Sequence, residues 1–121
     1  MNEVFKQDWK RYSGTEWSKA HILGLFKNRT MRYILLGRIS TSQNQVIKVL
    51  AGGLQKHIGN NMGCEIGWSN IGPGIVLTHP FGITVNSNAK IGKNCTLFKG
   101  CTIGSIRGGE NQEPLVLVTE W

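Results

Sequence analysis

The sequence predicts an α+β chain in which short N-terminal helices precede a parallel β-helix. Three observations lead to this prediction. Apolar residues recur with a helical period over the first half, the residue usage changes near position 60, and bulky aliphatic residues then appear at every sixth position. We therefore expect a helical region at residues 1–60 and a β-helix at residues 61–121.

The N-terminal region is expected to form three short helices, separated by polar breaks at residues 13–15 and 40–44. The best defined helix is expected from Ser18 to Ile39, where apolar residues recur near the helical period among basic ones. These apolar residues are Ile22, Leu25, Phe26, Tyr33 and Leu36. Such a basic amphipathic helix packs against a partner helix or lies on an anionic membrane surface, and both interpretations stay open. The glycine-containing stretches 52–53 and 59–61 are expected to end the helical pattern.

The net charge of +7 belongs to the N-terminal half of the chain. Residues 1–60 hold ten Lys and Arg against three acids, whereas residues 61–121 hold four against four. This surplus suits an acidic partner or is a solvated helical face. Nucleic-acid binding is not expected, because the repeat region has no interleaved aromatic and basic residues. No secretion signal is recognised at the N-terminus, so a cytoplasmic location is expected.

A six-residue period of aliphatic residues predicts the fold of the second half. The period continues after a two-residue slip, and its members are Ile71, Leu77, Ile83, Val85, Ile91, Leu97 and Ile103. Each hexad forms a short strand and a tight turn, so three hexads make a triangular coil with the aliphatic residue inside. The small residues Ala89, Cys95 and Cys101 are expected to face the axis near the corners. Residues that tolerate left-handed backbone are expected at the corners: Gly72, Gly74, Asn86, Asn88, Gly92 and Asn94.

The segment IGPGIVLTHPFGITVNSNAKIGKNCTLFKGCTIGS, residues 71–105, resembles the core of serine acetyltransferases. It also resembles their hexapeptide-repeat relatives from capsule or exopolysaccharide clusters. The phrases DWKRYSG and KNRTMRYILLGRIS resemble the helical region that precedes the repeats in those relatives. The resemblance implies a left-handed coil, although most parallel crossovers are right-handed. It also implies no bound cofactor, acetyl-CoA as co-substrate, a small hydroxyl-bearing acceptor and a homotrimer.

The resemblance assigns the general base to His79, which closes a G-I-x-L-x-H run. An imidazole has an ordinary pKa of about 6.5, so it can take the proton of an attacking alcohol at neutral pH. The alternative is an exposed corner residue. Glu65 is the candidate for the carboxylate that orients the base, and its alternative is a solvated acid. Ile66 and Ile71 lie five positions apart where a hexad needs six, so the reach of Glu65 is open.

Further site residues also follow from the resemblance. Thr78 stands where the family often has an acid that holds the amino-acid substrate, so the acceptor identity stays open. Gly104 and Ser105 resemble the start of the loop that closes over substrate and CoA. Arg107 is a basic candidate within this loop, and its alternative is a solvent-facing loop residue. A zinc site of three converging histidines is not expected, because only His79 lies in the repeat region.

Members of the family continue past this loop with about two more coils, whereas LVLVTEW follows Pro114 here without a further hexad. We expect a C-terminally truncated β-helix of about two coils, whose open edge invites strand pairing unless residues 115–118 cover it. Two hypotheses therefore compete: an active O-acetyltransferase and a non-catalytic, oligomerising remnant. Sugar-nucleotide acyltransferases stay in consideration, because their hexads look alike.

Overall fold

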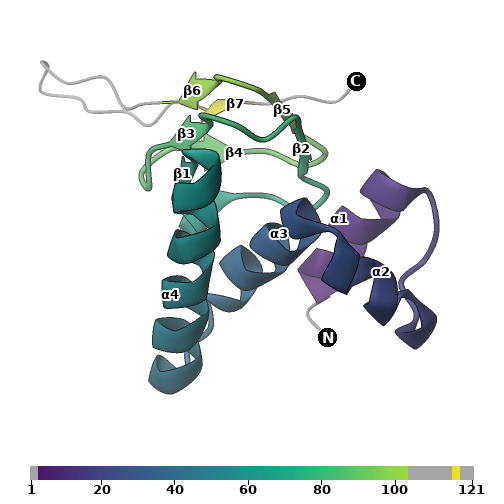
Figure 1. Cartoon of the computed structure of the whole chain (residues 1–121). Coiled ribbons are helices and arrows are strands. Elements are labelled where there is room, and N and C mark those ends of the chain that lie inside the picture. The colour runs from purple at the N-terminus through teal and green to yellow at the C-terminus, as the bar shows by residue number, and fades with distance from the viewer. Residues whose placement is uncertain (1–2, 104–115, 118–121) are drawn as a thin grey trace, which may run out of the picture.

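The computed structural model describes residues 3–103 and 116–117 and places helices before parallel strands, as predicted (Figure 1). The helices are α1 (Glu3–Ser13), the 3₁₀ turn η1 (Lys19–His21), α2 (Ile22–Lys27), α3 (Arg29–Ile39) and α4 (Gln45–Met62). They are followed by β1 (Glu65–Ile66), the 3₁₀ turn η2 (Trp68–Asn70), β2 (Val76–Thr78), β3 (Thr84–Val85), β4 (Lys90–Ile91), β5 (Thr96–Phe98), β6 (Thr102–Ile103) and β7 (Val116–Leu117).

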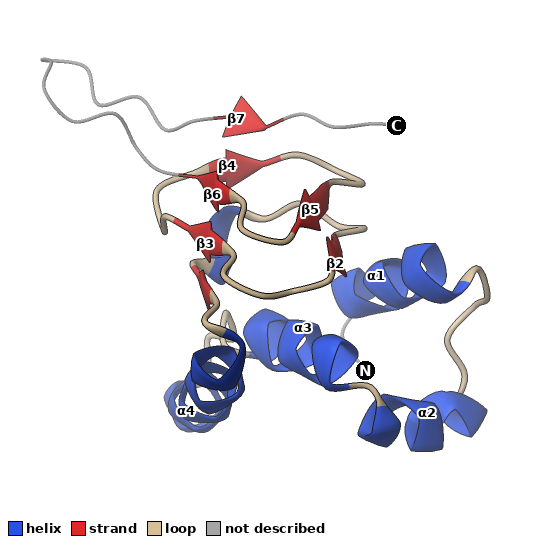
Figure 2. Cartoon of the chain, turned by 45° about the horizontal axis from the view of Figure 1, so that its top comes forward, coloured by secondary structure: helices blue, strands red, loops and turns tan. Residues whose placement is uncertain are grey.

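The strands form a three-sided parallel coil (Figure 2). Strands β1, β3 and β6 make one sheet, β2 and β5 a second, and β4 and β7 a third. Thr84 pairs with Thr102, one coil of 18 residues later along the chain. The bridge between Ile71 and Ile91 continues the third sheet into the first coil. The chain thus visits the three sheets in a fixed order, which is how a hexad-based coil buries one aliphatic residue per side.

The aliphatic column predicted from the six-residue period is confirmed. Val85, Ile91, Leu97 and Ile103 are each exposed by 4% or less. The small residues Ala89 and Cys95 are also buried, whereas Cys101 is only partly buried. The period therefore identified the side chains that fill the axis of the coil.

The prediction that Ile83 continues the register of Leu77 is wrong. Val85, and not Ile83, pairs with both Ile66 and Ile103 in the first sheet. Ile83 instead occupies the position two residues before the strand residue, where later coils carry Ala89 and Cys95. It is fully buried there. The two extra residues consequently lie in the turn between β2 and β3, which contains His79.

The single helix expected from Ser18 to Ile39 is wrong, because the chain breaks at Asn28. Asn28 is extended, and its side chain accepts a hydrogen bond from the Met31 amide, 3.1 Å away, so it caps the start of α3. The apolar period of the sequence therefore spans two separate helices, α2 and α3. Leu25 is buried on α2, while Ile22 and Phe26 are exposed.

The expectation that glycines end the helical pattern at residues 52–53 and 59–61 is also wrong, since α4 runs to Met62. Glycine inside a helix costs about 1 kcal/mol relative to alanine and does not by itself stop it. Gly59 has a packing role: a Cβ there would lie 2.7 Å from the Cys64 carbonyl oxygen and 3.1 Å from the Tyr33 ring. The helix ends at Gly63, which adopts the left-handed conformation with φ 66°.

A buried ion pair joins the helices to the coil. The Arg38 guanidinium donates from Nε to Asp8 Oδ2 at 2.8 Å and from Nη1 to the Ile71 carbonyl at 2.7 Å. Asp8 Oδ1 in turn accepts from the amides of Gly74 and Ile75, at 2.8 and 2.9 Å. The segment that leads into β2 is therefore fixed by side chains from α1 and α3.

Two expectations concern the open edge and the corners of the coil. Residues 116–117 form β7, which pairs in parallel with β4 and covers that strand. The six residues expected at the corners all lie in the segments between strands, and two of them, Gly74 and Asn94, adopt a positive φ. At Gly72 the absence of a side chain serves close approach, because a Cβ would lie 2.8 Å from the Gly92 backbone.

Candidate active site

His79 lies at an exposed corner of the coil directly after β2. Its backbone is left-handed, with φ 47°, a conformation that residues other than glycine rarely adopt. Asn94 is the other such residue in the described chain. Strained backbone of this kind persists where the surrounding structure holds it, and it is common at functional sites. In the described chain, the His79 side chain has no hydrogen bond or ion pair.

Hydrogen bonds hold the turn that carries His79 to the end of α4 on one side and to the next coil on the other. The Gly82 amide donates to the Met62 carbonyl at 3.0 Å, and the Gly100 amide donates to the Phe81 carbonyl at 2.9 Å. Inside the turn, the Phe81 amide donates to the carbonyl of His79 itself at 2.7 Å. The Cys64 thiol also donates to the Pro80 carbonyl at 3.2 Å. The corner is therefore anchored to the end of α4 and to the next coil.

Glycines with left-handed backbone stack along this corner. Gly63, Gly82 and Gly100 have φ values of 66°, 67° and 75°. A Cβ at Gly63 would lie 3.8 Å from the Gly82 amide nitrogen, and a Cβ at Gly82 would lie 3.9 Å from Gly100 Cα. Helix α4 thus ends in the same left-handed turn that the coil repeats at Gly82 and Gly100. The His79 turn is therefore stacked directly on the end of α4.

The neighbours of His79 are aromatic and basic. Thr78, the predicted substrate contact, is the last residue of β2; it is partly buried and pairs with Phe98 of β5. The rings of Phe81 and Phe98 are 46% and 54% exposed. The Arg29 guanidinium carbon lies 6.0 Å from the centre of the Phe81 ring, within the range of a cation–π contact. The corner therefore presents apolar ring surface beside the imidazole.

Glu65 and His79 lie on different sheets of the coil, since Glu65 is on β1 and His79 follows β2. Glu65 is exposed on β1 and pairs through its backbone with Thr84. Within the described residues, its carboxylate forms no ion pair or hydrogen bond with the imidazole. The predicted pairing of Glu65 with His79 consequently stays a prediction.

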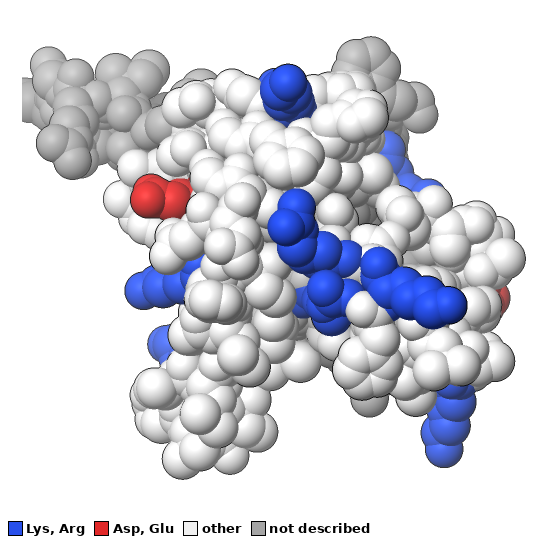
Figure 3. All heavy atoms as spheres, in the orientation of Figure 1, with Lys and Arg blue, Asp and Glu red and all other residues white. Residues whose placement is uncertain are grey.

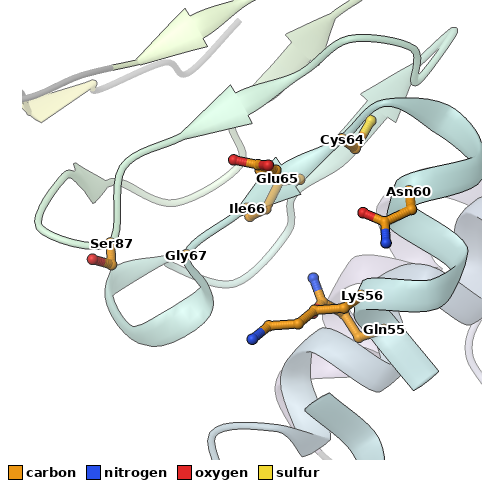
Figure 4. A pocket seen from close by; sticks show the side chains of 8 residues that line it. All are labelled: Gln55, Lys56, Asn60, Cys64, Glu65, Ile66, Gly67 and Ser87. Carbon is orange, nitrogen blue, oxygen red and sulfur yellow. The ribbon is translucent and has the colours of Figure 1, made fainter. Parts of the chain in front are cut away.

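A pocket of about 470 Å³ lies between the last turns of α4 and strand β1 (Figure 4). Its walls are formed by Gln55, Lys56, Asn60, Cys64, Glu65, Ile66, Gly67 and Ser87. Lys56 on α4 and Glu65 on β1 place opposite charges on its two walls, and neither is in an ion pair in the described chain. His79 does not line this pocket, so the pocket and the imidazole are separate features.

Burial perturbs one ionisable group next to this pocket. Tyr33 is fully buried and accepts a hydrogen bond at 3.1 Å from Gln55 Nε2. Burial raises the pKa of Tyr33 to about 12, and the neighbouring Cys64 adds to the increase. The phenol therefore stays protonated and serves to hold α3 against α4.

Three predicted site residues, Gly104, Ser105 and Arg107, lie outside the described residues. The sequence reasoning missed residues that position the coil: Asp8, Arg38 and Arg11. Arg11 donates at 3.0 Å to the carbonyls of both Gly74 and Cys95. A buried role could have been suspected for Asp8, because it lies between the apolar Phe5 and Trp9 of one helical face. Its partner Arg38 carries no comparable signal.

Comparison with solved structures places this arrangement among known folds. A serine acetyltransferase from Neisseria gonorrhoeae superposes with a TM-score of 0.67 and 24% sequence identity, over 96% of this chain. The chain has the fold of serine acetyltransferases. Native serine acetyltransferase 1 from Entamoeba histolytica matches 88% of the chain with a TM-score of 0.59 and 17% identity. The Entamoeba enzyme in complex with L-cysteine also matches 88%, with a TM-score of 0.61 and 16% identity.

The likeness to serine acetyltransferases covers part of those proteins. This chain spans 46% of the length of the gonococcal protein and 41% of each Entamoeba chain. No protein-family model and no curated protein matches the sequence. None of the described helices has both the length and the apolar character needed to cross a membrane. Within the described residues, no group of three His, Cys, Asp or Glu side chains could hold a metal ion.

Proposed function

We propose that the chain is a CoA-dependent O-acetyltransferase of the serine acetyltransferase type, acting on a small hydroxyl-bearing acceptor such as serine. The observation that carries this proposal is the His79 turn. Its exposed imidazole, which has no hydrogen bond or ion pair to any described residue, stands in left-handed backbone at a corner fixed by Met62 and Gly100. The shared fold supports the proposal, because the match to a serine acetyltransferase covers 96% of the chain.

The proposed reaction is a direct acetyl transfer. The acceptor hydroxyl attacks the thioester carbonyl of acetyl-CoA, and His79 takes the hydroxyl proton as the new C–O bond forms. The C–S bond then breaks, and the CoA thiolate leaves and receives a proton from the imidazolium. Acetyl-CoA is thus a co-substrate, and the base returns to its neutral form after each turnover.

The finer assignments belong to the same proposal. We assign a left-handed coil, a homotrimer and a CoA-closing loop that begins at Gly104 and Ser105. Thr78 and Arg107 are assigned to the acceptor. The chain's placement in the capsule or exopolysaccharide branch and its cytoplasmic location stay predictions of the sequence. The exposure of His79 at the corner favours a small-molecule acceptor, because such a molecule can reach the imidazole from solvent.

An assay of thiol release from acetyl-CoA, with serine and other small alcohols as acceptors, tests the proposal. The informative variant is His79→Gly, because glycine adopts φ 47° without strain and the fold should be kept or stabilised. Activity should fall by at least about a hundredfold, the usual contribution of a general base. The matched control is Asn94→Gly, which relieves the same kind of backbone at another corner and should stay active.

Equal activity in the wild type and His79→Gly would refute the assignment of His79. A folded wild type that releases no thiol with any acceptor would refute the acetyltransferase proposal and leave the non-catalytic remnant.

We assign Glu65 a positioning role toward His79. In that case Glu65→Gln should lower kcat with little change in KM, because the carboxylate orients the base without touching the acceptor. Glu65→Asp should restore activity, since aspartate is the residue that the family more often carries. An unchanged kcat in Glu65→Gln would remove Glu65 from the site.

A further inference from the structure

Helix α2 exposes its large apolar side chains and buries only one. Leu25 is 8% exposed, whereas Ile22, Leu23 and Phe26 are 41%, 74% and 69% exposed. These three side chains belong to two successive turns of the helix, at the i, i+1 and i+4 spacing of one face. Contiguous exposed apolar residues of this size mark an interaction surface more often than isolated ones do. The three residues are called the α2 patch below.

The α2 patch rests on a rigid base. The Trp9 ring lies 5.0 Å from the Trp17 ring and 5.3 Å from the His21 ring, measured between centroids. Arg32 of α3 donates to the carbonyls of Leu25 and Phe26 at the end of α2. The patch is therefore held in place before any partner binds, so little conformational entropy is lost on binding.

Unpaired basic side chains surround the α2 patch. Lys27 lies four residues after Leu23 on α2, and Lys19 lies in the preceding 3₁₀ turn η1. Both are exposed. The ion pairs of the described chain, Lys6–Glu3, Lys10–Glu16 and Arg38–Asp8, use neither of these lysines.

Acidic residues are scarce in the sequence around the patch, and Glu16, three residues before Lys19, is paired with Lys10. No Asp or Glu occurs between residues 17 and 64, a stretch that includes η1, α2, α3 and α4. Figure 3 shows Lys and Arg side chains gathered over the helical part of the visible face, with few acids. Helix α2 also lies at the end of the molecule away from the strands (Figure 2). A flat surface can therefore reach it without meeting the coil.

We propose that the α2 patch and its basic rim bind the surface of an anionic lipid bilayer. Leu23 and Phe26 enter the headgroup region, and Lys19 and Lys27 contact lipid phosphates. The charge distribution favours this partner over a second copy of the chain. Two patches facing each other would bring basic rims together without a carboxylate between them, which disfavours association.

Sedimentation of the full chain with vesicles tests this proposal. Vesicles of phosphatidylglycerol and phosphatidylcholine should bind the protein, and pure phosphatidylcholine vesicles should bind it far less. Lys19→Gln/Lys27→Gln should weaken binding by about fivefold for each charge removed, and raised salt should have a similar effect. Leu23→Ser/Phe26→Ser should reduce binding further.

Val49→Ser/Leu50→Ser is the matched control for the apolar pair. These residues are 70% and 64% exposed on α4, so the control removes two similarly exposed, somewhat smaller apolar side chains away from the α2 patch. It should leave vesicle binding unchanged. Circular dichroism of each variant shows that it is folded.

Equal binding to both vesicle types, or equal loss in the two serine double variants, would overturn the lipid proposal. Sedimentation velocity without vesicles tests whether the α2 patch binds a second copy of the chain instead. If Leu23→Ser/Phe26→Ser converts an oligomer to a monomer and lipid binding is absent, the α2 patch binds a second copy, and the proposal is wrong.

Discussion

Asp8 connects three parts of the molecule: α1, α3 and the segment before β2. It lies on α1 at 0% exposure, pairs with Arg38 of α3, and accepts from two amides of the segment before β2. A buried carboxylate is costly unless its oxygens are fully used, and both oxygens of Asp8 are hydrogen-bonded. Arg38 extends the network to the carbonyls of Ile71 and Gly72. The network fixes how the coil sits on the helices.

Replacing Asp8 with Asn should destabilise the chain strongly. The variant leaves the Arg38 cation buried at 5% exposure without its counter-charge, which costs about 3–5 kcal/mol. Urea unfolding followed by tryptophan fluorescence measures the loss. Glu3→Gln removes an exposed ion pair with Lys6 and should change stability little.

The double variant Asp8→Asn/Arg38→Gln separates charge imbalance from lost packing. It removes both charges, so it should be destabilised by less than the sum of the single variants. Additive losses would show that the two side chains act independently, against the ion pair inferred from the structure.

Tyr33 should make stability fall in alkaline solution. Burial raises the pKa of Tyr33 from 10.0 to about 12, so the folded chain keeps a proton that the unfolded chain loses between these values. Stabilisation is therefore fully present below pH 10 and is lost as the pH rises toward 12, by about 2–3 kcal/mol in all. Tyr33→Phe should show a smaller decline over this interval in urea unfolding. Tyr12→Phe, at a 47% exposed site, should decline like the wild type.

At the scale of elements, α4 shows how one residue type serves opposite purposes. Gly53 lies within the helix, where an added Cβ would meet nothing within 4 Å. Gly63 ends the helix with φ 66°, where any side chain strains the backbone. The start of the helix is capped by Asn44, whose side chain accepts from the amides of Val46 and Ile47. The length of α4 is thus set by its two ends and not by its internal glycines.

The same substitution at the two glycines should have opposite effects. Gly53→Ala should stabilise the chain by about 1 kcal/mol, because alanine favours the helical backbone at an open site. Gly63→Ala should destabilise it by about 1 kcal/mol, because the left-handed conformation is strained for alanine. Thermal unfolding followed by circular dichroism compares them. A destabilising Gly53→Ala would indicate that another chain packs closely against this face.

For the whole molecule, helices and coil share one hydrophobic core. The buried cluster runs from Phe5 on α1 through Met31 and Tyr33 on α3 to Leu97 and Ile103 in the coil. Trp68 lies between the helices and the coil. Its ring centre is 5.7 Å from that of Tyr33, and a Cβ at Gly37 would overlap the Trp68 ring. Neither half buries this surface alone. The two regions expected at residues 1–60 and 61–121 stay a prediction that unfolding experiments can test.

Unfolding should be a single cooperative transition. Far-UV circular dichroism reports mainly the helices, while tryptophan fluorescence includes Trp68 at the junction with the coil. Because the core is continuous, both signals should give the same urea midpoint. Two separated midpoints would show that the helical region and the coil unfold independently, and would favour the domain division over a common core.

The sequence alone determined the features that repeat locally. A six-residue period places Val85, Ile91, Leu97 and Ile103 inside the coil, because a side chain every sixth position must face the axis. The polar breaks at residues 13–15 and 40–44 were likewise located, since α1 ends at Ser13 and α3 ends before Ser40. It also singled out His79 through a resemblance in the residues around it.

The tertiary structure decided what depends on contacts between distant residues. No local pattern shows that Asp8 pairs with Arg38. Nor does one show that the Tyr33 ring packs closely against Gly59, or that Val85 takes the strand position expected for Ile83. The exposed face of α2 was also invisible, because a period continues through Asn28 even though the helix does not. Periodicity records which residues turn inward, whereas long-range pairing sets which segments meet and therefore where His79 stands.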